Sequence, residues 1–302
     1  MGVKTFSSLV DSGAAIRVFC VFICGAISQA FLVTSAHAQD PEASPVHWAY
    51  SSYFGTGWYQ IRDDRDVYVL RAAPHWMFRE ASLDEDGERT IGVNFRLAIA
   101  AGLDSLALDD IPGAIATDNL ATLSVTPGVE VTVPMNARWT LRPYASIGWG
   151  KLLSNSESAW TYWAGIKSRY AFSNGKLDWA LINALGYVGY TPSEGPSENF
   201  WPVLAGLEFD YPLSDHKSGE EQLFASWHGT YTRFASDLNL DVVTGADTSI
   251  TDQWELGFSV HKETSPFKIF WFGFERLGLA YRFSSSGDLK GISLVFQSVF
   301  DR

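Results

Sequence analysis

The segment from Thr90 to Leu103 alternates between apolar and small or polar side chains, and this alternation limits most strongly what the chain can fold into. Apolar residues occupy every second position, and Gly92, Asn94 and Arg96 lie between them. A period of two is typical of a β-strand with two unlike faces, and here it continues well beyond the length of an average soluble strand. A strand long enough to cross a bilayer, with a charge on the face away from lipid, predicts a transmembrane β-barrel.

The beginning of the chain has the pattern of a secretory signal peptide. Lys4 and Arg17 supply positive charge, the stretch 18–33 is mostly apolar, and an A-x-A cleavage pattern ends at Ala38. The alternative is an N-terminal transmembrane anchor, which is disfavoured because the apolar stretch is interrupted by polar residues and ends at small ones. We therefore expect a cleaved signal peptide over residues 1–38.

The mature chain, residues 39–302, is acidic and contains no cysteine. Both cysteines, Cys20 and Cys24, belong to the signal segment, so a closed hydrogen-bonded barrel would have to replace disulfides in holding the exported chain. Without the three charged residues of the signal, 20 basic and 33 acidic residues remain, a net charge of −13. Such a surface argues against a nucleic-acid partner. No composition typical of a linker divides the chain, so we expect one domain.

Segments with period-two character recur about twelve times. They predict an all-β fold, a transmembrane antiparallel up-and-down β-barrel of about 12 strands, with both ends of the chain on the periplasmic side because the strand number is even. The expected strands are 48–61, 66–79, 89–103, 120–134, 138–152, 159–172, 177–190, 200–213, 222–235, 253–263, 267–283 and 289–300.

The connections fall into two length classes. Tight turns are expected at 134–137 and 173–176, and the second contains an Asn-Gly pair that suits a type I′ hairpin. Long polar or acidic connections occupy 104–119, 191–199 and 236–252. Outer-membrane barrels show this asymmetry between short periplasmic turns and longer extracellular loops.

Aromatic residues bracket several of the expected strands. One such pair is Trp139 and Trp149, which lie ten residues apart on one face with apolar residues between them. Ten tilted residues cover roughly the height of the apolar band, so such pairs predict the two interfacial girdles. Similar brackets join Trp160 with Phe172 and Trp201 with Tyr211. The alternative is a large soluble β-sandwich with these aromatics in its core.

Two expected strands near the end of the chain depart from simple alternation. In 267–283 the aromatic residues change parity, and a β-bulge near Glu275-Arg276 would restore one face. The strand 289–300 alternates up to Phe300, and outer-membrane barrels commonly finish with such an aromatic-ended strand. Asp301 and Arg302 follow it here, which weakens that signal.

Assigning the apolar face of each strand to lipid places a set of ionisable residues in the lumen, because charged groups facing hydrocarbon are costly. Two interpretations remain open: a bracing network of opposite charges that fills the interior, or a polar conduit for small solutes. The lumen-facing candidates are Arg96, Glu130, Arg142, Lys167, Arg169, Glu208, Asp210, Glu255 and Arg282.

Catalytic and metal-binding patterns are sparse. Ser226 and His228 share the inward face, and with an acid such as Glu255 they could form a hydrolytic triad, while His261 is a second inward histidine. No G-x-S-x-G elbow and no H-x-x-x-H pattern occur. We expect no catalytic residue, no metal site and no cofactor. Acidic segments such as 84–88 could attract divalent cations, but solvated turns are the simpler interpretation.

Several phrases together resemble the solitary outer-membrane autotransporter-like β-barrel domain of Gram-negative bacteria. This resemblance implies a twelve-stranded barrel and carries no settled biochemical activity to particular residues. True autotransporters place a passenger and a threaded helix before the first strand, whereas here only about nine residues separate Gln39 from the first aromatic strand, so self-secretion is not expected. The phrases span residues 53–59 (YFGTGWY), 126–130 (TPGVE), 141–144 (LRPY), 148–150 (GWG), 164–170 (AGIKSRY), 252–257 (DQWELG) and 276–283 (RLGLAYRF).

The leading interpretation is an integral outer-membrane β-barrel without a passenger domain, structural or weakly pore-forming through its charged lumen, and not an enzyme. Its expected partners are outer-membrane lipid, lipopolysaccharide and, during insertion, the barrel assembly machinery. One alternative is a lipid or lipopolysaccharide hydrolase that uses a pair such as Ser226 and His228. Another is a surface binding module that acts through the acidic loops 104–119 and 236–252.

Overall fold

The computed structural model describes residues 54–61, 65–104, 120–152, 158–175, 177–193, 197–213, 221–239, 249–269 and 272–302. All of them belong to one compact unit, Ala43–Arg302. The expected signal peptide over residues 1–38 and most of the two acidic loops lie outside the described residues.

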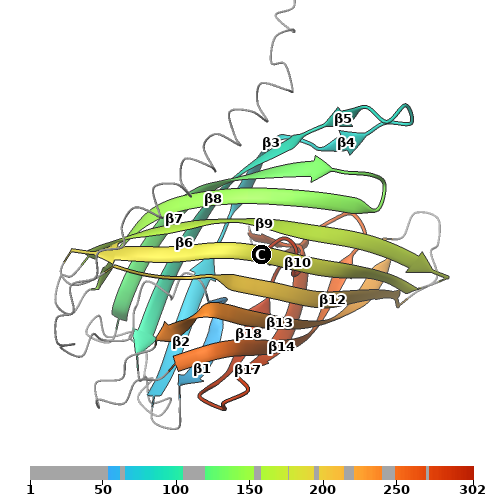
Figure 1. Cartoon of the computed structure of the whole chain (residues 1–302). Coiled ribbons are helices and arrows are strands. Elements are labelled where there is room, and N and C mark those ends of the chain that lie inside the picture. Colours follow the sequence, from blue (N-terminus) through green and yellow to red (C-terminus); the bar gives the residue numbers. More distant parts are fainter. Residues whose placement is uncertain are drawn as a thin grey trace, which may run out of the picture. The chain divides into compact units, whose positions relative to one another are not determined.

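Twelve antiparallel strands form one closed sheet, in which each strand pairs with its neighbours in sequence and the first strand pairs with the last. This arrangement confirms the expected up-and-down barrel (Figure 1). The strands are β1 (Gly57–Ile61), β2 (Arg65–Ala72), β6 (Gly92–Asp104), β7 (Leu120–Pro134), β8 (Trp139–Leu152), β9 (Ser158–Asn174), β10 (Leu177–Pro192), β12 (Pro202–Pro212), β13 (Leu223–Asn239), β14 (Ser249–Lys262), β17 (Arg276–Phe283) and β18 (Leu289–Val295).

Shorter strands extend the barrel at its rims. β3 (His75–Arg79) pairs with the first residues of β6, and β11 (Glu198–Phe200) pairs with the last residues of β10. Two small hairpins, β4 (Ser82–Leu83) with β5 (Arg89–Thr90) and β15 (Phe267–Ile269) with β16 (Phe272–Phe274), form sheets of their own.

The connections follow the two expected length classes only in part, because residues 73–91, 213–222 and 263–275 form long connections at the same end as the tight turns. At one end, here called the turn end, residues 135–138 join β7 to β8 and residues 175–176 join β9 to β10. Gly175 has a φ of 67°, which a residue without a Cβ adopts at little cost. At the other end, here called the loop end, the connections include residues 105–119 and 240–248. β1 begins and β18 ends at the turn end.

The outward face of the strands carries mostly apolar side chains. Along β12, Val203, Ala205 and Leu207 are exposed while Gly206 and Glu208 are buried. Tryptophan, leucine and isoleucine side chains that are roughly half exposed recur on strands all around the wall, from β2 to β18. A continuous apolar exterior of this kind is the surface that a membrane barrel presents to lipid. The described part of the chain contains no helix long and apolar enough to cross a membrane.

Aromatic ladders run across neighbouring strands near both ends of the wall. At the turn end, the rings of Phe172 and Trp179 stack with centroids 3.9 Å apart. At the loop end, Tyr187 stacks on Tyr162 at 5.9 Å and contacts Trp201 at 4.8 Å. These two rows correspond to the interfacial girdles that the bracketed strands predict.

The expected strand 267–283 is wrong, because the chain forms two separate elements there. Residues 267–274 make the β15–β16 hairpin, and the barrel strand β17 begins only at Arg276. Phe274 packs against Phe296, which follows β18, with ring centroids 4.8 Å apart, and it belongs to the hairpin sheet and not to β17. The parity change read as a β-bulge is therefore the boundary between two sheets.

The expected strand 289–300 is also too long. β18 ends at Val295, and the chain then turns, with Asp301 N donating to Ser298 O at 3.1 Å. Phe300 is 4 % exposed and lies inside the barrel instead of ending a lipid-facing strand. The physical reason is that this segment finds charged partners in the lumen, which are described below.

Closure of the barrel depends on close approach between the first and last strands. Gly57 of β1 lies opposite Ser293 of β18. A Cβ at Gly57 would overlap the main chain of Ile292 and Ser293, which cannot move aside as a flexible side-chain end could. The junction between β1 and β18, here called the seam, therefore requires glycine at position 57.

We predict that Gly57→Val destabilises the folded barrel by about 1–3 kcal/mol, the usual cost of overpacking. Denaturant unfolding of the refolded protein, followed by the mobility difference between boiled and unboiled samples, measures this change. Gly229→Ala is the control, because its Cβ would meet only the Leu256 side chain at 3.4 Å. An unchanged unfolding midpoint in Gly57→Val would contradict the proposed seam constraint.

Candidate functional site

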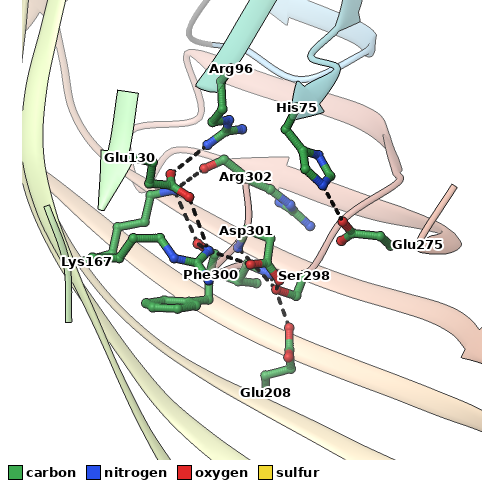
Figure 2. Close-up of polar contacts among 12 residues, drawn as sticks. His75, Arg96, Glu130, Lys167, Glu208, Glu275, Ser298, Phe300, Asp301 and Arg302 are labelled. Atoms are coloured by element: carbon green, nitrogen blue, oxygen red, sulfur yellow. Dashed lines mark hydrogen bonds and ion pairs between the residues drawn. The ribbon is translucent and has the colours of Figure 1, made fainter. Parts of the chain in front are cut away.

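The segment Phe296–Arg302, here called the C-terminal segment, folds back into the barrel lumen after β18. Val299 and Phe300 pack on Ala180 and Ile182 of β10, with Leu204 of β12 against the same cluster. Figure 2 shows the segment beside the inward side chains of the wall strands. An apolar anchor therefore holds the segment on the β10–β12 wall.

Glu130 of β7 is the centre of the first charge cluster. It is 3 % exposed and accepts contacts from Arg96 of β6 at 3.1 Å, Arg142 of β8 at 3.4 Å and Lys167 of β9 at 3.4 Å. Four consecutive strands thus contribute one inward charge each, because the inward positions of neighbouring strands lie side by side. A buried carboxylate requires such partners, since leaving it unpaired costs several kcal/mol.

The C-terminal segment completes this first cluster. Arg142 Nη1 donates to Asp301 Oδ1 at 2.5 Å, and its guanidinium lies 4.1 Å from the centre of the Phe300 ring. Lys167 Nζ donates to the Phe300 carbonyl oxygen at 3.2 Å and to the main-chain oxygen of Arg302. The two cations therefore bind the segment and the wall carboxylate at the same time.

The Asp301 carboxyl is held ionised in this position. Burial alone would raise its pKa, but the charge of Arg142, with hydrogen bonds from Ser298 and Arg142 and the charge of Lys167, outweighs burial and holds the pKa of Asp301 below its usual value. Docking of the segment is consequently coupled to the negative charge of Asp301.

Glu255 of β14 is the centre of a second cluster. It forms ion pairs with Arg282 of β17 and with Arg302, and His228 Nε2 of β13 lies 2.7 Å from its Oε1 atom. Arg302 Nη2 also lies 3.3 Å from His228 Nε2. The end of the C-terminal segment is thus fixed to strands β13 and β14, away from the strands of the Glu130 cluster.

A third cluster lies toward the turn end. Arg276 of β17 contacts Glu208 of β12 at 3.2 Å and Asp210 at 3.3 Å, and it donates to Ser226 Oγ at 2.8 Å. Glu208 in turn accepts from the main-chain N–H of Val299 at 3.2 Å. This cluster therefore also holds the C-terminal segment.

The geometry around Ser226 differs from that of a nucleophile triad. Its hydroxyl donates to Asp210, whereas in a triad it would donate to the histidine base and the acid would hold the far ring nitrogen. His261 meets both Ser226 (3.0 Å) and Asp210 (3.9 Å) through the same atom, Nδ1. His228 belongs to the Glu255 cluster and makes no contact with Ser226 among the described residues.

The structure brings eight of the nine lumen-facing candidates into these three clusters. Arg169 also has inward parity on β9, opposite Ile182, but joins none of them. The sequence interpretation missed Arg71, Arg276, Asp301 and Arg302 as lumen residues. The alternation along residues 276–282 places Arg276 on the same face as Arg282. Arg276 could therefore have been identified as a lumen residue if the preceding hairpin had been separated from β17. No group of three or more metal-binding side chains occurs within the described residues.

An apolar cluster occupies the lumen toward the loop end. It includes Tyr190 of β10, Phe200 of β11, Phe234 of β13 and Ile250 of β14, each at most 1 % exposed. The described lumen is thus filled at the loop end by this cluster, here called the loop-end cluster, and toward the turn end by the C-terminal segment.

No family model and no curated protein matches the chain. Among solved structures, the chain is similar to the translocator domain of autotransporter NalP from Neisseria meningitidis, with 13 % identity, a TM-score of 0.48, and coverage of 93 % of this chain and 94 % of that one. The barrel fold is established by the chain's own closed sheet of twelve antiparallel strands.

We predict that Arg142→Ala frees the C-terminal segment without opening the wall. Hydrogen bonds to charged groups contribute about 1.5–3 kcal/mol, so the amides of Val299 and Asp301 should exchange about tenfold faster or more. Hydrogen exchange of the folded protein measures this, and Arg138→Ala in the exposed 135–138 turn serves as the control. Equal exchange rates in both variants would show that Arg142 does not hold the segment.

Acid should weaken the docking through Asp301. Because its pKa in the folded state is depressed, the stabilisation is complete above the ordinary aspartate value of about 4 and is lost as the pH falls through the lower value. NMR signals of the Phe300 ring, followed from about pH 6 to about pH 3, should shift as the segment is released. In Asp301→Asn this step should be absent; a step that persists there would assign the titration to another group.

Proposed function

We propose that the chain is an integral outer-membrane β-barrel with a structural or weakly pore-forming role, whose lumen is closed by its own C-terminal segment. The observation that carries this proposal is the docking of the segment Phe296–Arg302 on four wall residues from different strands. These residues are Arg142, Lys167, Glu208 and Glu255. A polar lumen filled in this way is poorly suited to rapid solute passage.

The apolar exterior and the aromatic ladders support a lipid environment, and the expected signal peptide supports export to a Gram-negative outer membrane. In that setting the loop end faces outward and the turn end faces the periplasm. Outer-membrane lipid and lipopolysaccharide would then contact the wall, and the barrel assembly machinery would insert it.

No covalent chemistry is assigned to the barrel. The Ser226 hydroxyl is committed to Asp210 and Arg276, and His228 is committed to Glu255, so the side chains of the hydrolase alternative are held in ion-pair clusters. The binding-module alternative depends on the acidic loops, most of which lie outside the described residues, and it stays a prediction.

Conductance in planar bilayers tests the proposed closure. We predict rare, small current steps for the wild-type barrel, because both the C-terminal segment and the loop-end cluster obstruct its lumen. Steady steps should appear in the triple variant Phe200→Ala/Phe234→Ala/Asp301→Lys, which thins the cluster and repels the segment from Arg142 and Lys167.

Asp86→Lys is the matched control, because it makes the same change of charge at an exposed position between β4 and β5. Porin-like steady currents through the wild type would contradict the closed lumen. A correctly folded triple variant that stays silent would also contradict it. Hydrolysis of outer-membrane lipid that disappears in Ser226→Ala would overturn the assignment of no chemistry.

A further inference from the structure

A cavity of about 210 Å³ lies in the lumen between the C-terminal segment and the loop-end cluster. Its wall includes Val299 of the C-terminal segment and Ile182 of β10, on which the segment packs. On the other side it includes Val188 of the loop-end cluster and Trp163, which packs against that cluster. A volume of this size accommodates several water molecules together with a small solute. The cavity is therefore a chamber inside the barrel, separate from the outer loops.

The charges that line this cavity are predominantly positive. Arginine or lysine side chains outnumber the acids by three, although the mature chain carries a net charge of −13. The acids are Glu130 and Glu255, and each of them already contacts at least two cations. The lining cations are Arg71, Arg96, Lys167, Arg282 and Arg302.

Arg71 has no acid partner among the described residues. Its neighbour Leu70 is exposed on the outer face of β2, so the Arg71 side chain points inward, where it lines the cavity. The charged groups near enough to influence it electrostatically include Arg96, Arg282 and Arg302, which are all cations. Its Nε atom is buried and has no hydrogen-bond partner in the part of the chain that the structure describes.

Only one of the two terminal nitrogens of Arg96 has a partner among the described residues. Its Nη1 atom contacts Glu130 at 3.1 Å, whereas Nη2 is buried without a hydrogen-bond partner among the described residues. Buried guanidinium N–H groups without partners are costly, so two such arginines on one cavity indicate that a negatively charged acceptor is missing.

The remaining lining suits a compact polar ligand. Thr126, Ser146 and Thr230 bring hydroxyl groups to the wall, and Gly128 and Gly186 also line it. Hydroxyls donate to oxyanions, and guanidinium groups bind them with paired N–H donors in a planar fork.

We propose that this cavity is a binding site for a small oxyanion of phosphate size, held by Arg71 and Arg96 with the support of Arg282 and Arg302. The bound anion accepts hydrogen bonds from the N–H groups that the wall leaves unpaired. Its negative charge offsets the excess positive charge of the cavity lining. The site shares Arg96 with the Glu130 cluster and Arg282 and Arg302 with the Glu255 cluster, and it does not require that the barrel conduct ions. It lies behind the C-terminal segment, so release of that segment opens the route to it.

Equilibrium dialysis of labelled inorganic phosphate against the full-length mature barrel in detergent tests the proposal. We expect saturable binding of one phosphate per barrel at constant ionic strength. Arg71→Gln and Arg96→Gln should each bind at least about tenfold more weakly, as expected for loss of a buried charged partner. Arg71→Lys should bind more tightly than Arg71→Gln but more weakly than the wild type, because it keeps the charge and loses the paired donors of the guanidinium group.

Arg89→Gln is the control, because it removes one positive charge from the exposed β5 strand outside the lumen. Boiled and unboiled mobility establishes that each variant is folded before dialysis. A folded wild type without saturable binding up to about 10 mM phosphate would overturn the site. Equal affinity in wild type, Arg71→Gln and Arg96→Gln would overturn it as well.

A parallel dialysis with labelled glycerol phosphate distinguishes the two sources of the same chemistry. Binding of inorganic phosphate alone assigns the site to the free ion, and binding of both assigns it to a phosphate monoester such as a small headgroup. Neither result depends on bilayer currents, so failure of the closed-lumen proposal leaves this measurement valid.

Discussion

The whole structure depends on closure of the backbone hydrogen-bond ladder. A β-sheet exposed to lipid has no water to satisfy its edges, so every strand needs a neighbour on both sides. Pairing of β1 with β18 provides the last of these ladders, and the close approach at Gly57 permits it. Closure in turn creates an interior toward which most charged residues in the middle of the strands point.

That interior is organised around buried carboxylates. Glu130, Glu208 and Glu255 are each nearly inaccessible, and each is held by cations from neighbouring strands or from the C-terminal segment. Charged side chains inside the barrel would otherwise need water molecules as hydrogen-bond partners. Here the C-terminal segment supplies part of these partners. The excess of positive charge stays concentrated in the central cavity, which is why that cavity suits an anion.

The barrel could be predicted from the sequence because its main signal is local. Outward apolar residues and inward polar ones follow each other at a period of two, so one strand such as β6 already identifies the lipid face. Eight of the nine lumen candidates join the clusters for the same reason. Arg71 was missed because the inward face of β2 also carries Val67 and Val69, which belong to the apolar interior, so parity alone does not distinguish its two faces.

The C-terminal segment could not be predicted, since its residues continue the alternation of β18 and their partners are distant in sequence. Arg142 and Asp301 are 159 positions apart. The segment leaves the seam, crosses the lumen, and contacts β8, β9, β12 and β14. A tube supported only by its wall flattens easily under lateral pressure, but here flattening across this direction would have to break ion pairs. The segment therefore acts as an internal cross-brace that makes the cross-section of the barrel resistant to deformation.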